Sequence, residues 1–88
     1  MTKVVTKLRH LRLQAAAKRG TPLPMQEVAN ATGMLISRIN YLELGKFERI
    51  DTRELLALSA FYSQQLDKLV DIADILSFDE QRETPLAV

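Results

Sequence analysis

The 88-residue sequence predicts an all-α domain of five helices. Along most of the chain apolar residues recur at spacings of three and four, which is the periodicity of amphipathic helices. The alternation of apolar and polar residues that marks a half-buried strand is almost absent. Apolar residues make up 47% of the chain and charged residues 26%, an ordinary globular composition. A chain of this length supports one small hydrophobic core.

The first two predicted helices are joined by a rigid connector. Apolar spacing predicts a first helix from about Thr6 to Lys18, which Gly20 ends. The following segment reads Gly-Thr-Pro-Leu-Pro, a turn-forming sequence. Its last residue, Pro24, suits the first turn of a second, short helix, where a missing N–H leaves no partner unpaired. We expect four side chains on the inward face of that helix: Met25, Val28, Ala29 and Thr32.

The third predicted helix, about Leu35 to Leu44, lies between two glycines. Gly33 permits the sharp turn that precedes it, and Gly45 ends it. With about 100° per residue, its inward arc holds Leu35, Ile39, Leu42 and, at the edge, Glu43. Its outward arc holds Ser37, Tyr41 and Leu44, flanked by Ile36, Arg38 and Asn40. The helix therefore turns a mixed polar and apolar face to solvent.

Two further helices complete the predicted fold. Asp51-Thr52-Arg53-Glu54 has the form of a capping box, so a fourth helix begins there. Its inward side chains are Leu55, Leu58, Ser59 and Tyr62. A fifth helix is predicted over about Gln64 to Leu76, with inward side chains Leu66, Leu69, Val70, Ala73 and Leu76. The domain thus covers residues 1–76, and residues 77–88 are expected to form a polar, flexible tail.

Charge is distributed unevenly along the chain, although the net charge is only +1. Residues 1–49 hold nine bases and three acids, a net charge of +6. Residues 50–88 hold three bases and eight acids, a net charge of −5, so the two halves add up to +1. A basic half of this kind suits contact with phosphate, and an unevenly charged, solvated surface is the alternative interpretation.

Several classes of function find no support in the residues. The chain has no cysteine, which excludes disulfides, thiolate zinc sites and a cysteine nucleophile, and one histidine cannot form a three-histidine metal site. His10 is predicted on the first helix and Asp51 and Ser59 on the fourth, and no nucleophile motif surrounds any serine, so we expect no enzyme. The helical spacing of three acids favours a solvated face over a metal site: Asp67, Asp71 and Asp74.

Membrane and secretory signals are also missing from the sequence. No apolar run approaches the roughly 20 residues that cross a bilayer. The N-terminal residues carry charge, but no secretory apolar block follows them. We therefore expect a cytoplasmic protein without a membrane partner, a metal or a cofactor.

The most informative stretch, residues 27–46, carries a spaced set of small, apolar and glycine residues. The set consists of Val28-Ala29, Gly33, Ile39 and Glu43-Leu44-Gly45-Lys46. It resembles the lambda-repressor-like (Cro/cI or Xre type) helix-turn-helix DNA-binding domains, and the likeness extends over about residues 5–76. The resemblance implies a sequence-specific regulator that binds double-stranded DNA and represses transcription by occupying an operator.

The same resemblance implies roles for individual residues. The helix over residues 35–44 would be the recognition helix in the major groove. The implied base-contacting residues are Ile36, Ser37, Asn40 and Tyr41. The implied phosphate-contacting residues are Gln26, Arg38, Lys46 and Arg49. Arg12 and Glu43 match a family pair that ties the first helix to the recognition helix.

The chain departs from the family pattern in ways that leave a second interpretation open. Leu35 stands where the family usually has a Ser or Thr cap, and Gln26 falls one place later than the family's glutamine. The apolar side chains Ile36, Tyr41 and Leu44 would also suit a protein-interaction module. An antitoxin, which binds both DNA and a protein partner, would combine the two interpretations.

Self-association is a further expectation. Ile72 and Ile75 fall outside the inward arc of the predicted fifth helix, and Phe78 follows them. These apolar side chains suit a wider core or a contact between two copies. A small DNA-binding unit gains affinity by pairing, so we expect a homodimer.

Overall fold

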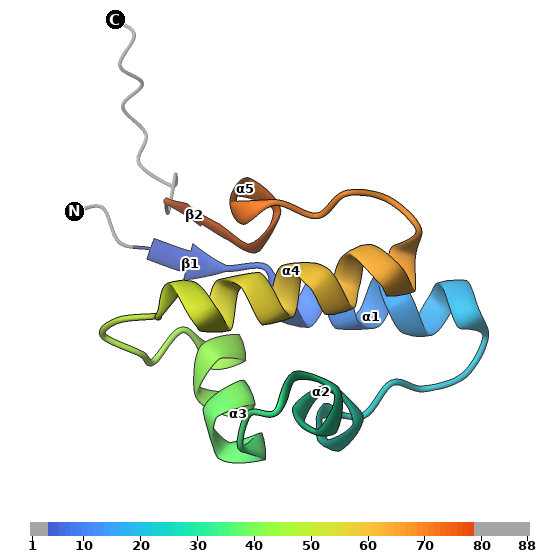
Figure 1. Ribbon diagram of the computed structural model, residues 1–88, viewed down its shortest axis with the longest axis horizontal. Coiled ribbons are helices and arrows are strands. Elements are labelled where there is room, and N and C mark those ends of the chain that lie inside the picture. The colour runs from blue at the N-terminus through green and yellow to red at the C-terminus, as the bar shows by residue number, and fades with distance from the viewer. Residues whose placement is uncertain (1–3, 79–88) are drawn as a thin grey trace, which may run out of the picture.

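The computed structural model describes residues 4–78. Helices hold 64% of these residues, and two short strands form a small antiparallel sheet. In chain order the elements are β1 (Val4–Thr6), α1 (Leu8–Arg19), α2 (Met25–Thr32), α3 (Ile36–Leu44), α4 (Thr52–Leu66), α5 (Ile72–Ile75) and β2 (Leu76–Phe78) (Figure 1). The mostly helical composition agrees with the predicted class, whereas the sheet was not predicted.

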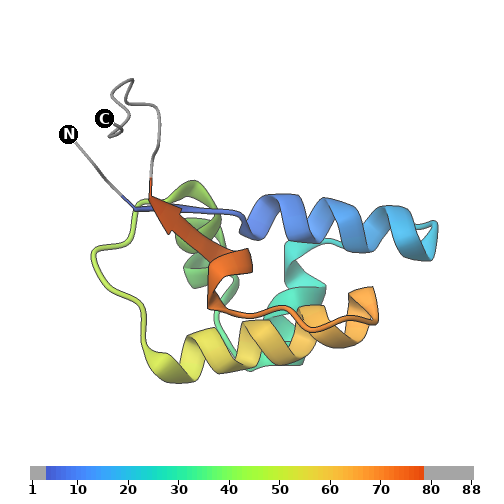
Figure 2. The same ribbon diagram turned by 90° about the horizontal axis from the view of Figure 1, so that it is seen from above.

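The helices surround one core. The two longest, α1 and α4, pack against each other, and α2 packs against both α3 and α4. The buried apolar side chains are Leu8, Leu11, Ala15, Leu23, Val28, Ala29, Ile39, Leu42, Leu58, Tyr62, Val70 and Ile75. In Figure 1, α2 and α3 lie on one side of the α1–α4 pair, and α5 and β2 lie on the other; Figure 2 views the molecule from the α5 side.

Two glycines end the helices that form the candidate site, as predicted. Gly33 and Gly45 adopt left-handed φ angles of 76° and 73°, which glycine tolerates without steric cost. The Gly33 N–H donates to the Ala29 carbonyl at 2.9 Å, and this bond closes α2. Both turns therefore follow from local backbone rules.

Leu35 is a correction to the predicted inward face of α3. This residue has extended backbone angles, φ −74° and ψ 145°, and precedes the first helical residue. It therefore does not follow the helical rotation, and its side chain is 75% exposed. The other apolar residues of the predicted inward arc, Ile39 and Leu42, are buried as expected.

The predicted fifth helix over residues 64–76 is wrong. Helix α4 continues to Leu66, and Asp67 ends it in a left-handed conformation with φ 56°. After a short loop, only Ile72–Ile75 form another helical turn. Because the chain changes direction, the predicted inward residues Leu69 and Ala73 are exposed, whereas Ile75 is buried.

Two serines of α4 explain this change of direction. The Ser63 hydroxyl accepts the Val70 N–H at 2.9 Å, and the Ser59 hydroxyl donates to the Val70 carbonyl. These bonds satisfy the backbone of Val70 outside a helix and hold its side chain in the core. Side-chain hydroxyls that bond backbone groups in this way compete with continued helix.

The sheet joins the two ends of the described chain. Val4 pairs with Phe78 and Thr6 with Leu76, and the Lys7 N–H donates to the Ile75 carbonyl at 2.8 Å. The first helix consequently begins two residues later than predicted. The predicted tail boundary at residue 77 falls within β2, and the rest of that tail, residues 79–88, lies outside the described residues.

Candidate nucleic-acid interface

Helices α2 and α3 form a compact pair joined by a three-residue turn. They pack against each other, and the buried Ala29 leaves room for their close approach. The Met34 N–H donates to the Ala29 carbonyl at 3.1 Å, and the Met34 side chain packs against the core. Of the predicted inward side chains of α2, Val28 and Ala29 are buried, and Met25 and Thr32 are half-buried. The pair therefore holds α3 at the periphery of the fold.

A two-point ion pair fixes α3 to α1, as the family resemblance implies. Arg12 Nε and Nη2 donate to the Glu43 carboxylate at 2.7 and 3.0 Å. Arg12 Nη1 donates to the Leu23 carbonyl at 3.0 Å, so the same side chain also fixes the connector between α1 and α2. The hydrogen bonds that Arg12 donates to Glu43 raise the pKa of Arg12. The Glu43 side chain is only 5% exposed, which limits screening by water.

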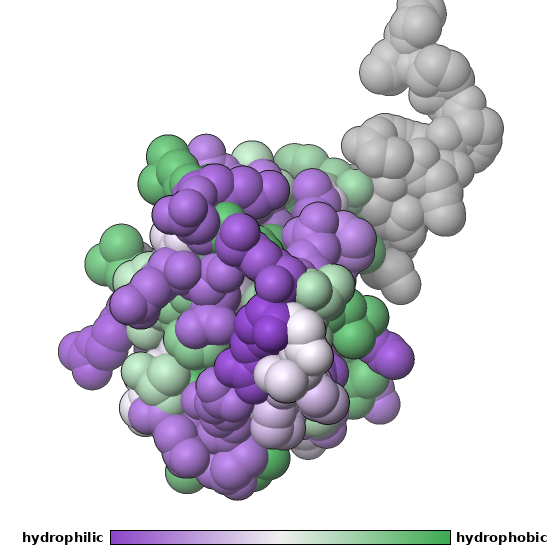
Figure 3. Space-filling view, turned by 90° about the vertical axis from the view of Figure 1, so that its right-hand side faces the viewer, coloured by the Kyte–Doolittle hydropathy of each residue, from purple (hydrophilic) through white to green (hydrophobic). Residues whose placement is uncertain are grey.

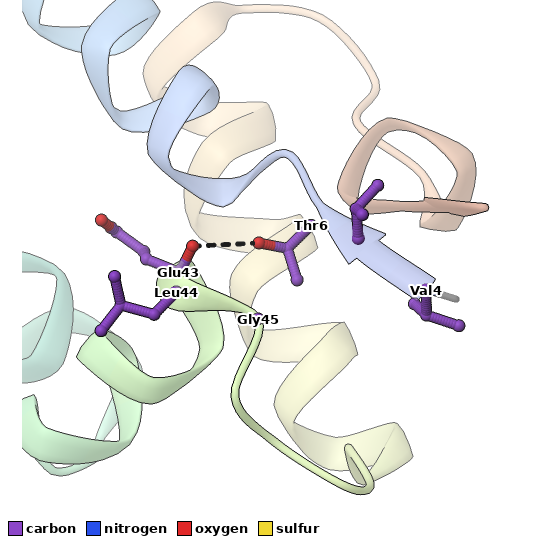
Figure 4. A pocket seen from close by; sticks show the side chains of 6 residues that line it. Val4, Thr6, Glu43, Leu44 and Gly45 are labelled. Carbon is purple, nitrogen blue, oxygen red and sulfur yellow. Dashed lines mark hydrogen bonds between the residues drawn. The ribbon is translucent and has the colours of Figure 1, made fainter. Parts of the chain in front are cut away.

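Strand β1 holds the C-terminal end of α3. The Thr6 hydroxyl donates to the Leu42 carbonyl at 2.9 Å and to the Glu43 carbonyl at 3.4 Å, the contact drawn in Figure 4. The last carbonyls of a helix lack partners within it, and this hydroxyl supplies one. A hollow of about 170 Å³ lies beside the contact, and Leu44 and Gly45 line it together with β1.

The outward face of α3 contains the four residues for which the sequence predicts base contacts. Ser37 is exposed and Asn40 is half-buried. The apolar neighbours are also accessible to solvent, with Ile36 43% exposed and Tyr41 53% exposed. The structure thus brings hydrogen-bonding and apolar groups together along one side of a helix.

The four predicted phosphate contacts fall in two places around α3. Gln26 is exposed in the first turn of α2, where its amide donates to Asn30 Oδ1 at 2.9 Å. Lys46 and Arg49 are exposed in the loop that follows α3. Arg38 differs from these three residues because its guanidinium bonds to Glu54, at 2.7 and 2.9 Å, and to the Arg49 carbonyl at 2.8 Å.

The sequence interpretation missed two ion pairs around this site. Arg38 pairs with Glu54, and this hydrogen bond is the main cause that lowers the pKa of Glu54. Arg19 pairs with Glu27 in the first turn of α2 and likewise lowers the pKa of that carboxyl. The only sequence signal was the capping box that singled out Glu54, and nothing in it specified a partner 16 positions away.

Three of the residues considered for other chemistry form hydrogen bonds that shape the fold. The Ser59 hydroxyl bonds the Val70 carbonyl, and Asp71 and Asp74 form a capping box at α5. Within residues 4–78, no three His, Asp or Glu side chains are arranged to hold a metal ion. The end of the molecule where α1 and α4 finish is covered mainly by hydrophilic side chains (Figure 3).

In the described range, no helix combines the length and apolar character needed to cross a bilayer. Comparisons with protein-family models, curated proteins and solved structures find no match to this chain. The resemblance carried by residues 27–46 therefore stays a prediction.

Proposed function

We propose that the protein is a lambda-repressor-like helix-turn-helix regulator that binds double-stranded DNA sequence-specifically and represses transcription. In this proposal α3 enters the major groove. The observation that supports it is the asymmetry of α3, whose Ile39, Leu42 and Glu43 face the fold while Ser37 and Tyr41 face solvent. A helix about 10 Å wide fits a major groove about 12 Å wide.

The outward side chains supply the chemistry that base recognition needs. Ser37 and Asn40 carry groups that hydrogen-bond the edges of bases, and asparagine suits adenine, which offers an adjacent donor and acceptor. Ile36 and Tyr41 supply apolar surface for the methyl group of thymine. This combination distinguishes base pairs, which a surface carrying only cations does not.

Phosphate contacts would flank the recognition helix. Gln26 and the N-terminal end of α2 offer donors on one side, where helix N–H groups lack intrahelical partners. Lys46 and Arg49 offer positive charge on the other side, in the loop after α3. Such contacts fix the orientation of a protein on the duplex without reading its sequence. Repression then follows from occupancy, because the bound protein competes with polymerase.

The test is a salt titration of binding to a duplex selected from a random-sequence pool by the purified protein. We expect enrichment of one sequence and an affinity that falls steeply with salt, with a logarithmic slope of about −0.9 for each phosphate neutralised. A scrambled duplex of equal length is the control for sequence preference. Failure to enrich any sequence, together with a slope near zero, would contradict the proposal.

A protein-interaction surface is the second candidate function. Its support is a run of exposed apolar side chains on and before α3, which includes Leu35 and Leu44 as well as Ile36 and Tyr41. Contiguous exposed apolar surface is typical of sites that bind proteins. A complex formed through this surface should respond little to salt, so the same titration separates the candidates. An antitoxin would form both kinds of complex.

The homodimer stays a prediction, with a smaller set of contacts than the sequence suggested. Ile72 and Phe78 are exposed, and a hollow of about 260 Å³ lies between them, lined also by Val4 and Leu76. Ile75 is buried and cannot contact a second copy. Sedimentation equilibrium of the free protein tests the prediction, and a monomer at all concentrations would contradict it.

A further inference from the structure

Arg38 connects α3 to the chain that follows it. Its side chain leaves the first turn of α3 and reaches Glu54 in the first turn of α4. Nε donates to Glu54 Oε2 at 2.7 Å, and Nη2 donates to Glu54 Oε1 at 2.9 Å. A two-point contact between planar groups fixes orientation as well as distance.

The same network holds the loop between α3 and α4. Arg38 Nη2 also donates to the Arg49 carbonyl at 2.8 Å, and Glu54 Oε1 accepts the Asp51 N–H at 3.0 Å. On the inner side of the loop, Phe47 and Ile50 pack against the core. The loop is therefore held from inside by apolar contacts and from outside by Arg38 and Glu54.

Arg38 differs from the exposed cations of the loop because its charge is neutralised within the network. The positive charge of Arg38 is balanced by the Glu54 carboxylate. Nε and Nη2 of the guanidinium both donate to that carboxylate. Lys46 and Arg49 are exposed to solvent in the loop itself. The exposed charges of Lys46 and Arg49 are available to a phosphate, whereas the charge of Arg38 is already compensated by Glu54.

We propose that Arg38 is a positioning residue rather than a phosphate contact. Its pairing with Glu54 sets the loop that carries Lys46 and Arg49 against α3, so that base-reading and phosphate-binding groups meet one duplex in a fixed arrangement. This inference rests on the proposed DNA-binding function. It identifies the Arg38–Glu54 ion pair as the contact that holds the base-reading helix and the phosphate-binding loop in place. A fixed arrangement lowers the entropy lost on binding.

The Glu54→Gln variant distinguishes the two roles because they predict opposite signs. If charge alone matters, removal of a carboxylate near the duplex strengthens DNA binding. If Arg38 positions the loop, the loss of the two-point contact weakens binding by about 3- to 30-fold. Circular dichroism and thermal melting of each variant confirm that the measured protein is folded.

Conservative replacement of Arg38 provides the second comparison. Arg38→Lys keeps the charge but cannot reproduce the two-point contact. A phosphate contact would retain most of its affinity in this variant, whereas positioning predicts a loss similar to that of Glu54→Gln. The double variant Arg38→Gln/Glu54→Gln should then bind DNA no more weakly than Arg38→Gln alone, because both substitutions remove the same two-point contact.

Amide hydrogen exchange without DNA gives a readout that does not depend on binding. We expect faster exchange over residues 46–51 in Glu54→Gln and in Arg38→Lys. Lys46→Ala is the matched control, which should lower DNA affinity without changing exchange in the loop. If the wild-type protein binds no DNA, the proposed function fails, and the exchange data alone decide whether Arg38 orders the loop. Tighter DNA binding by Glu54→Gln, or unchanged exchange in both variants, would overturn the inference.

Discussion

The two sides of α3 are held in very different ways. On the inner side, Ile39 and Leu42 are buried and Glu43 receives two hydrogen bonds from Arg12. On the outer side, Ser37 and Tyr41 are open to solvent. Inner residues therefore decide whether the helix is in place, and outer residues decide what it binds. Substitutions on the inner side should therefore change stability, and substitutions on the outer side should change recognition.

The largest expected effect is on the inner side, at Leu42. Leu42→Ala should lower the free energy of unfolding by about 2–5 kcal/mol, because the side chain is fully buried and its removal leaves a cavity. Urea denaturation measures the change. Leu44→Ala, two residues along the same helix, is the exposed control and should change stability by less than about 0.5 kcal/mol. Equal losses in the two variants would contradict the assigned sides of α3.

The next largest effect is expected at the ion pair between α1 and α3. Glu43→Ala leaves the Arg12 guanidinium without its partner in a partly buried position, so stability should fall by about 3 kcal/mol. Thermal melting and urea denaturation check this value. Glu27→Ala breaks a pair of the same type in an exposed position and should cost clearly less, because water screens that pair. A larger loss of stability in Glu27→Ala than in Glu43→Ala would contradict this prediction.

On the outer side, Ser37→Ala and Asn40→Ala should change recognition and leave folding intact. If both side chains read bases, each substitution relaxes discrimination at one or two positions of the site by roughly 1–3 kcal/mol. Competition binding with single-base variants of the selected duplex measures the change. Unaltered discrimination at every position would remove these residues from the reading surface.

A uniform and smaller effect is expected at Lys46. Lys46→Ala should weaken binding to all duplexes by a similar factor and reduce the magnitude of the salt slope by about 0.9, the contribution of one phosphate. The melting temperature should not change. A loss of affinity confined to the selected duplex would instead indicate a base contact at this residue.

The smallest predicted effect concerns pH and the Arg38–Glu54 pair. The hydrogen bond from Arg38 lowers the pKa of Glu54 in the folded protein. Its stabilising contribution is therefore complete above the ordinary carboxyl pKa of about 4.3 and disappears as the pH falls through the lowered value. The difference in melting temperature between wild type and Glu54→Gln should shrink from pH 7 to pH 3. A difference that stays constant would show that Glu54 keeps its ordinary pKa.

Local rules predicted most of the region around α2 and α3, with Leu35 as the exception. The turns at Gly33 and Gly45 depend on backbone conformations that glycine adopts easily, and the buried positions of Val28 and Ile39 follow the helical period. The start of α4 followed from a capping box whose two residues, Asp51 and Glu54, are three positions apart. Arg12–Glu43 is a longer contact, and only the family resemblance implied it.

Long-range contacts determined the parts that the sequence did not predict. The sheet depends on pairing between Val4 and Phe78, at opposite ends of the described chain. Strands of three residues are too short to show an alternating pattern. Two other features likewise depend on tertiary position. One is the pair of serine hydroxyls that bond Val70, and the other is the pairing of Arg38 with Glu54. No local pattern specifies such partners.

The most direct test of the central proposal is a map of backbone amide chemical shifts while the selected duplex is added. We expect the largest changes at five residues, four on α3 and one in the following loop: Ile36, Ser37, Asn40, Tyr41 and Lys46. Changes confined to α5 and β2, with α3 unaffected, would contradict it.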